Sequence, residues 1–265
     1  MSYRCTILGC GSSGGVPRIG MNWGSCDPDN PKNRRLRCSA LIERTGSGGR
    51  TAVLIDTSPD FREQILATRL TALDGVLYTH DHADHTHGID DLRMVAFAMK
   101  RRVDVYFNKE TGDSLKSRFN YCFETPAGSP YMPMLNGNEI DGVAPVAIAG
   151  GGGTISARPV MQWHGSIKSL GYRVSNLAYS PDINDIPAES IPLLEGLDVW
   201  IVDALRHTPH ESHFSVKQAL AWVERLKPKR TILTHMTSEL DYETLARQLP
   251  EGVEPAYDGM MISFT

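Results

Sequence analysis

Three histidines and two aspartates stand within six residues of this chain, in the run His80–His85 (HDHADH). The run directly follows Val76–Thr79, an apolar segment that predicts a buried strand. In an extended or turning backbone, the first two histidines can point to the same side, while Asp84 and His85 lie on the next bend. Imidazole and carboxylate groups suit zinc, manganese or iron(II) better than magnesium or calcium. Because such groups are costly to bury without partners, the run predicts a metal site at the end of a strand.

Predicted strands and helices alternate along the chain in two batches. Apolar segments predict strands at Tyr3–Leu8, Ser39–Arg44, Thr51–Asp56, Gly75–Thr79, Val103–Phe107, Thr154–Trp163, Ser169–Val174, Leu177–Tyr179, Asp198–Asp203, Arg230–Thr234 and Pro255–Phe264. Apolar residues at helical spacing predict helices at Asp60–Leu70, Asp90–Met99, Ser215–Leu226 and Tyr242–Leu249. Residues 123–153 are rich in Pro, Gly and Asn, and are expected to be irregular, either as a flexible loop or lid or as an insertion with no role. This order predicts a layered α/β fold, and the length permits one large domain or two small ones.

Composition limits the classes of protein to which the chain can belong. Its 265 residues are 41% hydrophobic, which is ordinary for a protein with a buried core. The net charge is −4, so no general basic surplus attracts nucleic acid. The basic runs Asn33–Arg37 and Lys100–Arg102 are either solvated turns or sites that attract phosphate. No apolar run is long enough for a signal peptide or a bilayer span, so we expect a cytoplasmic protein without membrane contact.

Residues further along the chain complete the pattern that begins with His80–His85. His164, Asp182 and His235 each stand just beyond a predicted strand. With the H-x-H-x-D-H run, they resemble the metal-binding motif of the metallo-β-lactamase superfamily, and the resemblance covers essentially the whole chain. It implies a single domain over residues 1–265 with an αββα fold, which is a four-layer sandwich of two mixed β-sheets flanked by helices.

The resemblance also implies two divalent metal ions per chain, Zn²⁺ or Mn²⁺, with a bridging hydroxide as the nucleophile. The implied ligands are His80, His82 and His164 for one ion, Asp84, His85 and His235 for the other, and Asp182 as a bridge. Asp56, at the end of a predicted strand, resembles the acidic residue that holds a ligand imidazole from behind. A turn aspartate without a role is the alternative.

Three further segments resemble the phosphodiesterase branch of the superfamily. They are the glycine-rich loop Gly9–Pro17, the spacing from His164 to Leu170–Arg173, and His213 before the helix at Ser215–Leu226. This branch includes tRNA 3′-processing endonucleases and the phosphoribosyl 1,2-cyclic phosphate phosphodiesterases of the carbon–phosphorus lyase pathway. The second group is the more similar, on Val16-Pro17, Arg34-Arg35, Ile232–His235 and Tyr257–Met260.

We therefore expect hydrolysis of a small phosphodiester or nucleotide-like substrate, including a cyclic one. In the family, the residue that matches His213 assists cleavage as an acid or a transition-state donor. Asp84 could orient the nucleophile besides binding metal, and Ser12 and Ser13 could bind the phosphate. His87, His207 and His210 are expected to be ordinary loop residues.

Three alternatives stay open. A tRNA endonuclease is disfavoured because the net charge is negative and residues 123–153 are not notably basic. A thioester or lactone hydrolase on the same scaffold, or a metal-bound protein without catalysis, would have no need of His213. A homodimer is expected only by analogy with the family.

Overall fold

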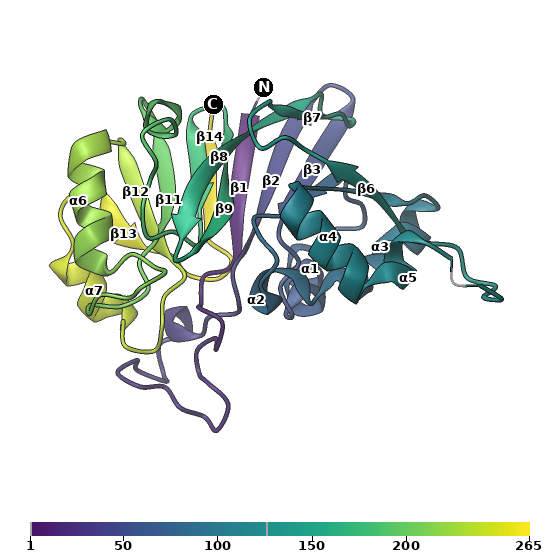
Figure 1. Ribbon diagram of the computed structural model, residues 1–265. Coiled ribbons are helices and arrows are strands. Elements are labelled where there is room, and N and C mark those ends of the chain that lie inside the picture. Colours follow the sequence, from purple (N-terminus) through teal and green to yellow (C-terminus); the bar gives the residue numbers. More distant parts are fainter. Residues whose placement is uncertain (1, 126) are drawn as a thin grey trace.

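The computed structural model describes residues 2–125 and 127–265, which form two mixed sheets of seven strands each (Figure 1). The first sheet has the order β14-β1-β2-β3-β4-β5-β6, and the second has the order β13-β12-β11-β10-β9-β8-β7. The strands are β1 Ser2–Gly9, β2 Ser39–Gly46, β3 Gly49–Ile55, β4 Gly75–Leu77, β5 Val103–Phe107, β6 Leu135–Glu139, β7 Val146–Ile148, β8 Ile155–His164, β9 Ile167–Val174, β10 Leu177–Ser180, β11 Val199–Asp203, β12 Arg230–Thr234, β13 Val253–Pro255 and β14 Met261–Phe264.

Helices cover the outer faces of the two sheets (Figure 1). They are α1 Phe61–Thr68, α2 Ala83–Thr86, α3 Leu92–Met99, α4 Lys109–Arg118, α5 Asn120–Phe123, α6 Val216–Leu226 and α7 Tyr242–Gln248, with 3₁₀ turns at Pro31–Asn33, Ile89–Asp91 and Ile191–Leu194. The predicted αββα sandwich is therefore confirmed. Among the described residues, no helix is long and apolar enough to cross a bilayer.

Strand β3 shows how the sequence builds these layers. Val53 and Ile55 lie in the core between the two sheets, whereas Ala52 and Leu54 lie in the core under α1, α3 and α4. Successive side chains of a strand point to opposite faces, so a strand that is apolar at every position is buried on both. The apolar runs that predicted strands thus also predict that both faces of each sheet are buried, one by the other sheet and one by helices.

Two parts of the secondary structure differ from the prediction. The single strand expected at Pro255–Phe264 is wrong: β13 ends at Pro255 in the second sheet, and β14 starts at Met261 in the first. A turn with Gly259 at φ +87° separates them. The prediction that residues 123–153 are irregular is wrong for β6 and β7, which form the edges of the first and second sheets. Pro126 lies outside the described residues.

Candidate metal centre

Strand directions bring the predicted ligands to one edge of the sandwich. β10, β11 and β12 are parallel neighbours, so Asp182, Asp203 and His235 stand at or just past neighbouring strand ends. β8 runs in the same direction, because it is antiparallel to β9, which is antiparallel to β10. Its last residue is His164, which the sequence had placed just after the strand. In the first sheet, β3 and β4 are parallel, and Asp56 and His80 follow their ends.

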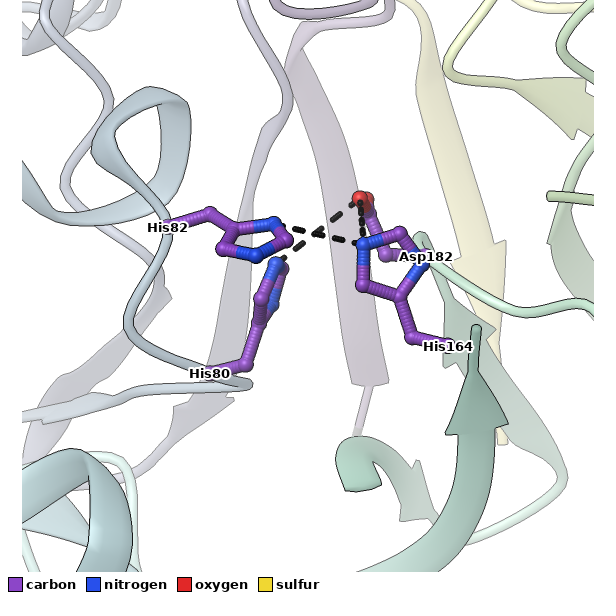
Figure 2. A group of neighbouring side chains, drawn as sticks. All are labelled: His80, His82, His164 and Asp182. Atoms are coloured by element: carbon purple, nitrogen blue, oxygen red, sulfur yellow. Dashed lines mark hydrogen bonds and ion pairs between the residues drawn. The ribbon is translucent and has the colours of Figure 1, made fainter. Parts of the chain in front are cut away.

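The ligand atoms expected from the sequence form two groups that meet at Asp182, and a third group that could hold a metal ion, made of Asp182, His213 and His235, overlaps them. The first group is His80, His82, His164 and Asp182 (Figure 2), and the second is Asp84, His85 and His235, with the ligand atoms of each group within 4.8 Å of one another. Asp182 Oδ2 lies 3.8 Å from His80 Nε2 and 3.5 Å from His164 Nε2. Its Oδ1 lies 3.0 Å from His85 Nε2 and 3.3 Å from His235 Nε2. One carboxylate therefore faces both groups.

Hydrogen bonds to the outer nitrogens hold the imidazoles in place. His85 Nδ1 donates to Asp56 Oδ2 at 2.7 Å. His80 Nδ1 lies 3.0 Å from the Thr79 hydroxyl, which itself donates to Asp56 Oδ2 at 2.8 Å. On the other sheet, His164 Nδ1 donates to the Ser212 carbonyl at 2.6 Å. A neutral imidazole at each of these positions carries its proton on the outer nitrogen, so its Nε2 lone pair faces the centre. The carboxylates of Asp182, Asp84 and Asp56 outweigh burial and raise the pKa of His85, so this ring has to lose a proton when it binds metal.

Several buried atoms of the centre have no hydrogen-bond partner. Four of them face the centre, namely His80 Nε2, His85 Nε2, His235 Nε2 and Asp182 Oδ1, and the outer His235 Nδ1 and Asp203 Oδ1 also lack a hydrogen-bond partner. Buried polar atoms without a partner are rare because their desolvation is uncompensated. Imidazole and carboxylate lone pairs that converge in this way are the donor set of zinc and similar ions. The residues present therefore fit a divalent metal ion.

Burial also favours the neutral ligand form of two imidazoles of the first group, those of His80 and His164. Burial lowers the pKa of His80 well below its ordinary value, and His85 lowers it further. Burial likewise lowers the pKa of His164 to about 4. Burial raises the pKa of Asp182, but His235 and His85 outweigh it and hold that pKa well below its ordinary range. Neutral imidazoles and an ionised carboxylate are the states that bind metal.

Asp84 lies at the second group, with Oδ2 3.5 Å from both His85 Nε2 and His235 Nε2. This position fits its expected place as a ligand. Ser12 and Ser13 lie in the glycine-rich loop, where the Ser12 amide donates to the carbonyl of Met236, next to His235. Ser12 is buried and Ser13 is exposed. Their phosphate-binding role stays a prediction.

His213 enters the centre from the loop before α6. Its Nδ1 lies 2.7 Å from Asp203 Oδ2, and its Nε2 lies 3.9 Å from Asp182 Oδ2. Its ring stacks on that of His235, with centroids 4.6 Å apart. The sequence analysis missed Asp203. An aspartate at the end of a buried strand was the signal that identified Asp56, and Asp203 carries the same signal, since it ends the strand next to the one that His235 follows.

The three histidines expected to be ordinary loop residues differ in position. His87 packs edge-on against Phe119, with ring centroids 5.5 Å apart. His210 instead lies beside His213, with ring centroids 5.2 Å apart. His207 is exposed on the same loop. His210 therefore lies in the loop, as predicted, and in addition contacts His213.

Comparison with known proteins places the chain among metal-dependent hydrolases. The model of the β-lactamase superfamily domain matches residues 51–236. A solved structure described as a new diphosphatase from the PhnP family is 37% identical, with a TM-score of 0.89 over 100% of this chain and 98% of that one. Zn²⁺-bound PqqB from Methylobacterium extorquens shares the fold at 18% identity, with a TM-score of 0.75 over 98% of this chain and 99% of that one.

A curated relative carries a different description. An octanoyltransferase from Porphyromonas gingivalis (strain ATCC BAA-308 / W83) is 34% identical over 262 residues, which are 97% of this chain. The match covers 51% of that protein, so the chain spans about half the length of this relative. Because the β-lactamase model spans most of the chain and the ligand residues converge, the protein belongs to the β-lactamase superfamily, as a metal-dependent hydrolase that resembles the PhnP family.

Proposed function

We propose that the protein is a phosphoric diester hydrolase with two metal ions, which acts on a small substrate. The observation that carries this proposal is Asp182, whose two oxygens face the two ligand groups, with His213 beside it. His80, His82 and His164 would hold one ion, Asp84, His85 and His235 the other, and Asp182 both. Bound divalent ions supply a water molecule of lowered pKa and neutralise charge that develops on the phosphate.

The protein's own groups would position the substrate and move the proton. When the His213–Asp203 pair holds two protons, His213 Nε2 bears an N–H that can donate to the leaving oxygen. General-acid assistance of this kind contributes about 10²–10⁴ in rate. Asp56 would fix the tautomer of His85 from behind the centre. Ser12 and Ser13 are the candidates for contact with the phosphate oxygens.

Two comparisons bear on the substrate. The PhnP-family neighbour is described as a diphosphatase, and a P–O–P linkage is close in charge and geometry to a phosphodiester. The relative described as an octanoyltransferase points to acyl chemistry, which a thioester hydrolase would share. All five cysteines of this chain are buried, and burial raises the pKa of each thiol. Buried thiols of raised pKa are poor nucleophiles, so acyl transfer through a cysteine of this chain is disfavoured, whereas a thioester hydrolase that uses metal-activated water needs no thiol and is separated by the assay below.

The test is hydrolysis of bis(p-nitrophenyl) phosphate by protein of measured metal content, with added Mn²⁺ or Zn²⁺. A 2′,3′-cyclic nucleotide and a thioester are assayed beside it. Turnover of the diesters with about two metal ions per chain, lost in His213→Ala, is the expected result. Turnover of the thioester alone would move the function to the acyl branch. The homodimer and the cytoplasmic location stay predictions.

A further inference from the structure

The loop Arg206–Ser215 between β11 and α6 is closed at its base. The Leu205 amide donates to the Phe214 carbonyl at 2.9 Å, and the Val216 amide donates to the Arg206 carbonyl at 3.0 Å. The base is buried, whereas the tip at residues 207–211 is exposed. The loop therefore presents its tip from a fixed base, next to the centre that His213 enters.

His210 stands at this tip with a fixed proton. Its Nδ1 accepts a hydrogen bond from the Ser212 amide at 3.3 Å, so a neutral imidazole carries its proton on Nε2. The same Ser212 accepts from His164 Nδ1 through its carbonyl, which links the position of His210 to that of a candidate ligand. The His210 ring contacts the ring of His213, and His213 in turn lies beside Asp182.

Arg206 adds a permanent positive charge to the same loop. Its Nε donates to the Thr208 carbonyl and its Nη2 to the Pro209 carbonyl, both at 3.3 Å. A guanidinium has five N–H groups, so donors remain for a ligand. These two carbonyls belong to the residues directly before His210, so the guanidinium lies over the same tip of the loop. Burial lowers the pKa of His210, and the nearby His213 and Arg206 lower it further. Glu211 is the opposing charge on this loop and raises the same pKa.

We propose that Arg206 and His210 form a subsite for a second phosphate group, directly beside the phosphate that is attacked at the metal centre. This inference rests on the proposed function and narrows its substrate class to diesters of diphosphate, R–O–PO₂⁻–O–PO₂⁻–O–R′. A substrate with one phosphate, held at the metals, gives these two side chains no anionic partner; Arg206 then keeps only its bonds to the Thr208 and Pro209 carbonyls. A diphosphate brings its second anionic group to the side of the leaving oxygen, where His213 and His210 lie together.

The reaction adds one water across the P–O–P linkage. The water oxygen bonds to the attacked phosphorus, and the bond from that phosphorus to the bridging oxygen breaks. The bridging oxygen leaves with the second phosphorus, so the products are two phosphate monoesters that share the two protons of the water. The negative charge that develops on the leaving phosphate is the charge that Arg206 and His210 would stabilise.

Binding of two small probes to the metal-loaded protein tests the subsite without turnover. Methylenediphosphonate carries two phosphonate groups, and methylphosphonate carries one. Calorimetry gives both dissociation constants, while metal content is measured on the recovered protein. The variants are His210→Ala, Arg206→Ala and Glu211→Gln, with His207→Ala as the matched control from the same loop.

The wild-type protein should bind methylenediphosphonate at least ~10-fold more tightly than methylphosphonate, as an added charge-assisted contact implies. His210→Ala and Arg206→Ala should each reduce that ratio, Glu211→Gln should increase it, and His207→Ala should leave it unchanged. Equal affinity for the two probes, or a ratio that neither Ala variant changes, overturns the subsite. If the wild type does not hydrolyse bis(p-nitrophenyl) phosphate, the proposed function is wrong. The ratio of the two dissociation constants tests the subsite separately, because it does not depend on turnover.

Discussion

His213 Nδ1 and Asp203 Oδ2 are 2.7 Å apart, and this contact turns the other ring nitrogen of His213 toward the metal centre. Asp203 is fully buried at the end of β11, and its Oδ2 also accepts from the Ile183 amide at 3.2 Å. The carboxylate is thus held from two sides before it holds the imidazole. His213 is therefore part of a positioned pair and not a mobile loop residue.

Asp203→Asn should lower kcat for bis(p-nitrophenyl) phosphate by about 10²-fold, the lower end of what a general acid contributes. The amide keeps the shape of the side chain, but it can offer an N–H to His213 Nδ1 and so reverse the tautomer. Metal content should stay near that of the wild type. Because the two residues act as a unit, Asp203→Asn combined with His213→Ala should cost little more than His213→Ala alone. Independent, multiplying effects would show that the pair does not act together.

His82→Ala should lower the metal content and abolish hydrolysis together. His82 is exposed and its Nδ1 lies 3.2 Å from His164 Nε2, so its removal costs little packing but opens the first ligand group. His87→Ala is the matched control, because His87 is also exposed and packs on Phe119 instead. Metal analysis and the diester assay give both readouts. Normal metal content with full activity in His82→Ala would remove this residue from the ligand set.

Asp56→Asn should weaken metal binding by about 10–100-fold, the usual cost of removing a group that orients a ligand. Asp56 has φ +63°, a conformation that asparagine tolerates better than most residues, so the backbone should be retained. The new amide meets His85 Nδ1 and the Thr79 hydroxyl, both of which donate to the carboxylate now. Metal competition with a chromophoric chelator measures the loss. An unchanged affinity for metal would mean that Asp56 stabilises the fold but does not orient a ligand.

Asp258 should make the protein less stable as pH rises. Burial raises the pKa of Asp258 to about 7, although it accepts hydrogen bonds from the Cys10 and Leu36 amides. Between about pH 4 and pH 7 the unfolded chain has released this proton and the folded chain keeps it, so the free energy of unfolding falls by roughly 1.4 kcal/mol per pH unit.

Asp258→Asn does not titrate and should lack this slope. Urea unfolding of the metal-free wild type and variant, both with chelator at pH 5 and at pH 7, gives the free energies of unfolding to be compared. The difference in stability between the wild type and the variant should shrink or reverse toward pH 7. Parallel curves would mean that Asp258 is ionised in the folded protein throughout this range.

Short-range patterns in the sequence were enough for much of the fold and for the candidate ligands. Strands buried on both faces are apolar at nearly every position, and the polar residues that follow them stand out, as His80 and His235 do. The helix α4 escaped prediction because only Thr111, Gly112 and Leu115 of its ten residues are buried, so its apolar face is too narrow to give a helical period.

Long-range contacts decided the rest. The short strands β13 and β14 belong to different sheets, and no local pattern shows which partner a strand of three or four residues will find. Asp203 was missed because its role depends on His213, ten residues further on and across a loop. The position of His210 beside that imidazole has the same origin.

The pairing of β14 with β1 has a consequence for synthesis of the protein on the ribosome (Figure 1). Tyr3 faces Phe264 in this pairing, so one edge of the first sheet stays open while the intervening residues are translated. Every candidate ligand has emerged before Met261 does. A nascent chain could thus have its metal-binding residues in place while β1 still offers an unprotected edge to neighbouring chains. When β14 pairs with β1, the eight-residue edge of β1 is replaced by the four-residue edge of β14. Short edge strands offer less backbone for pairing with other chains.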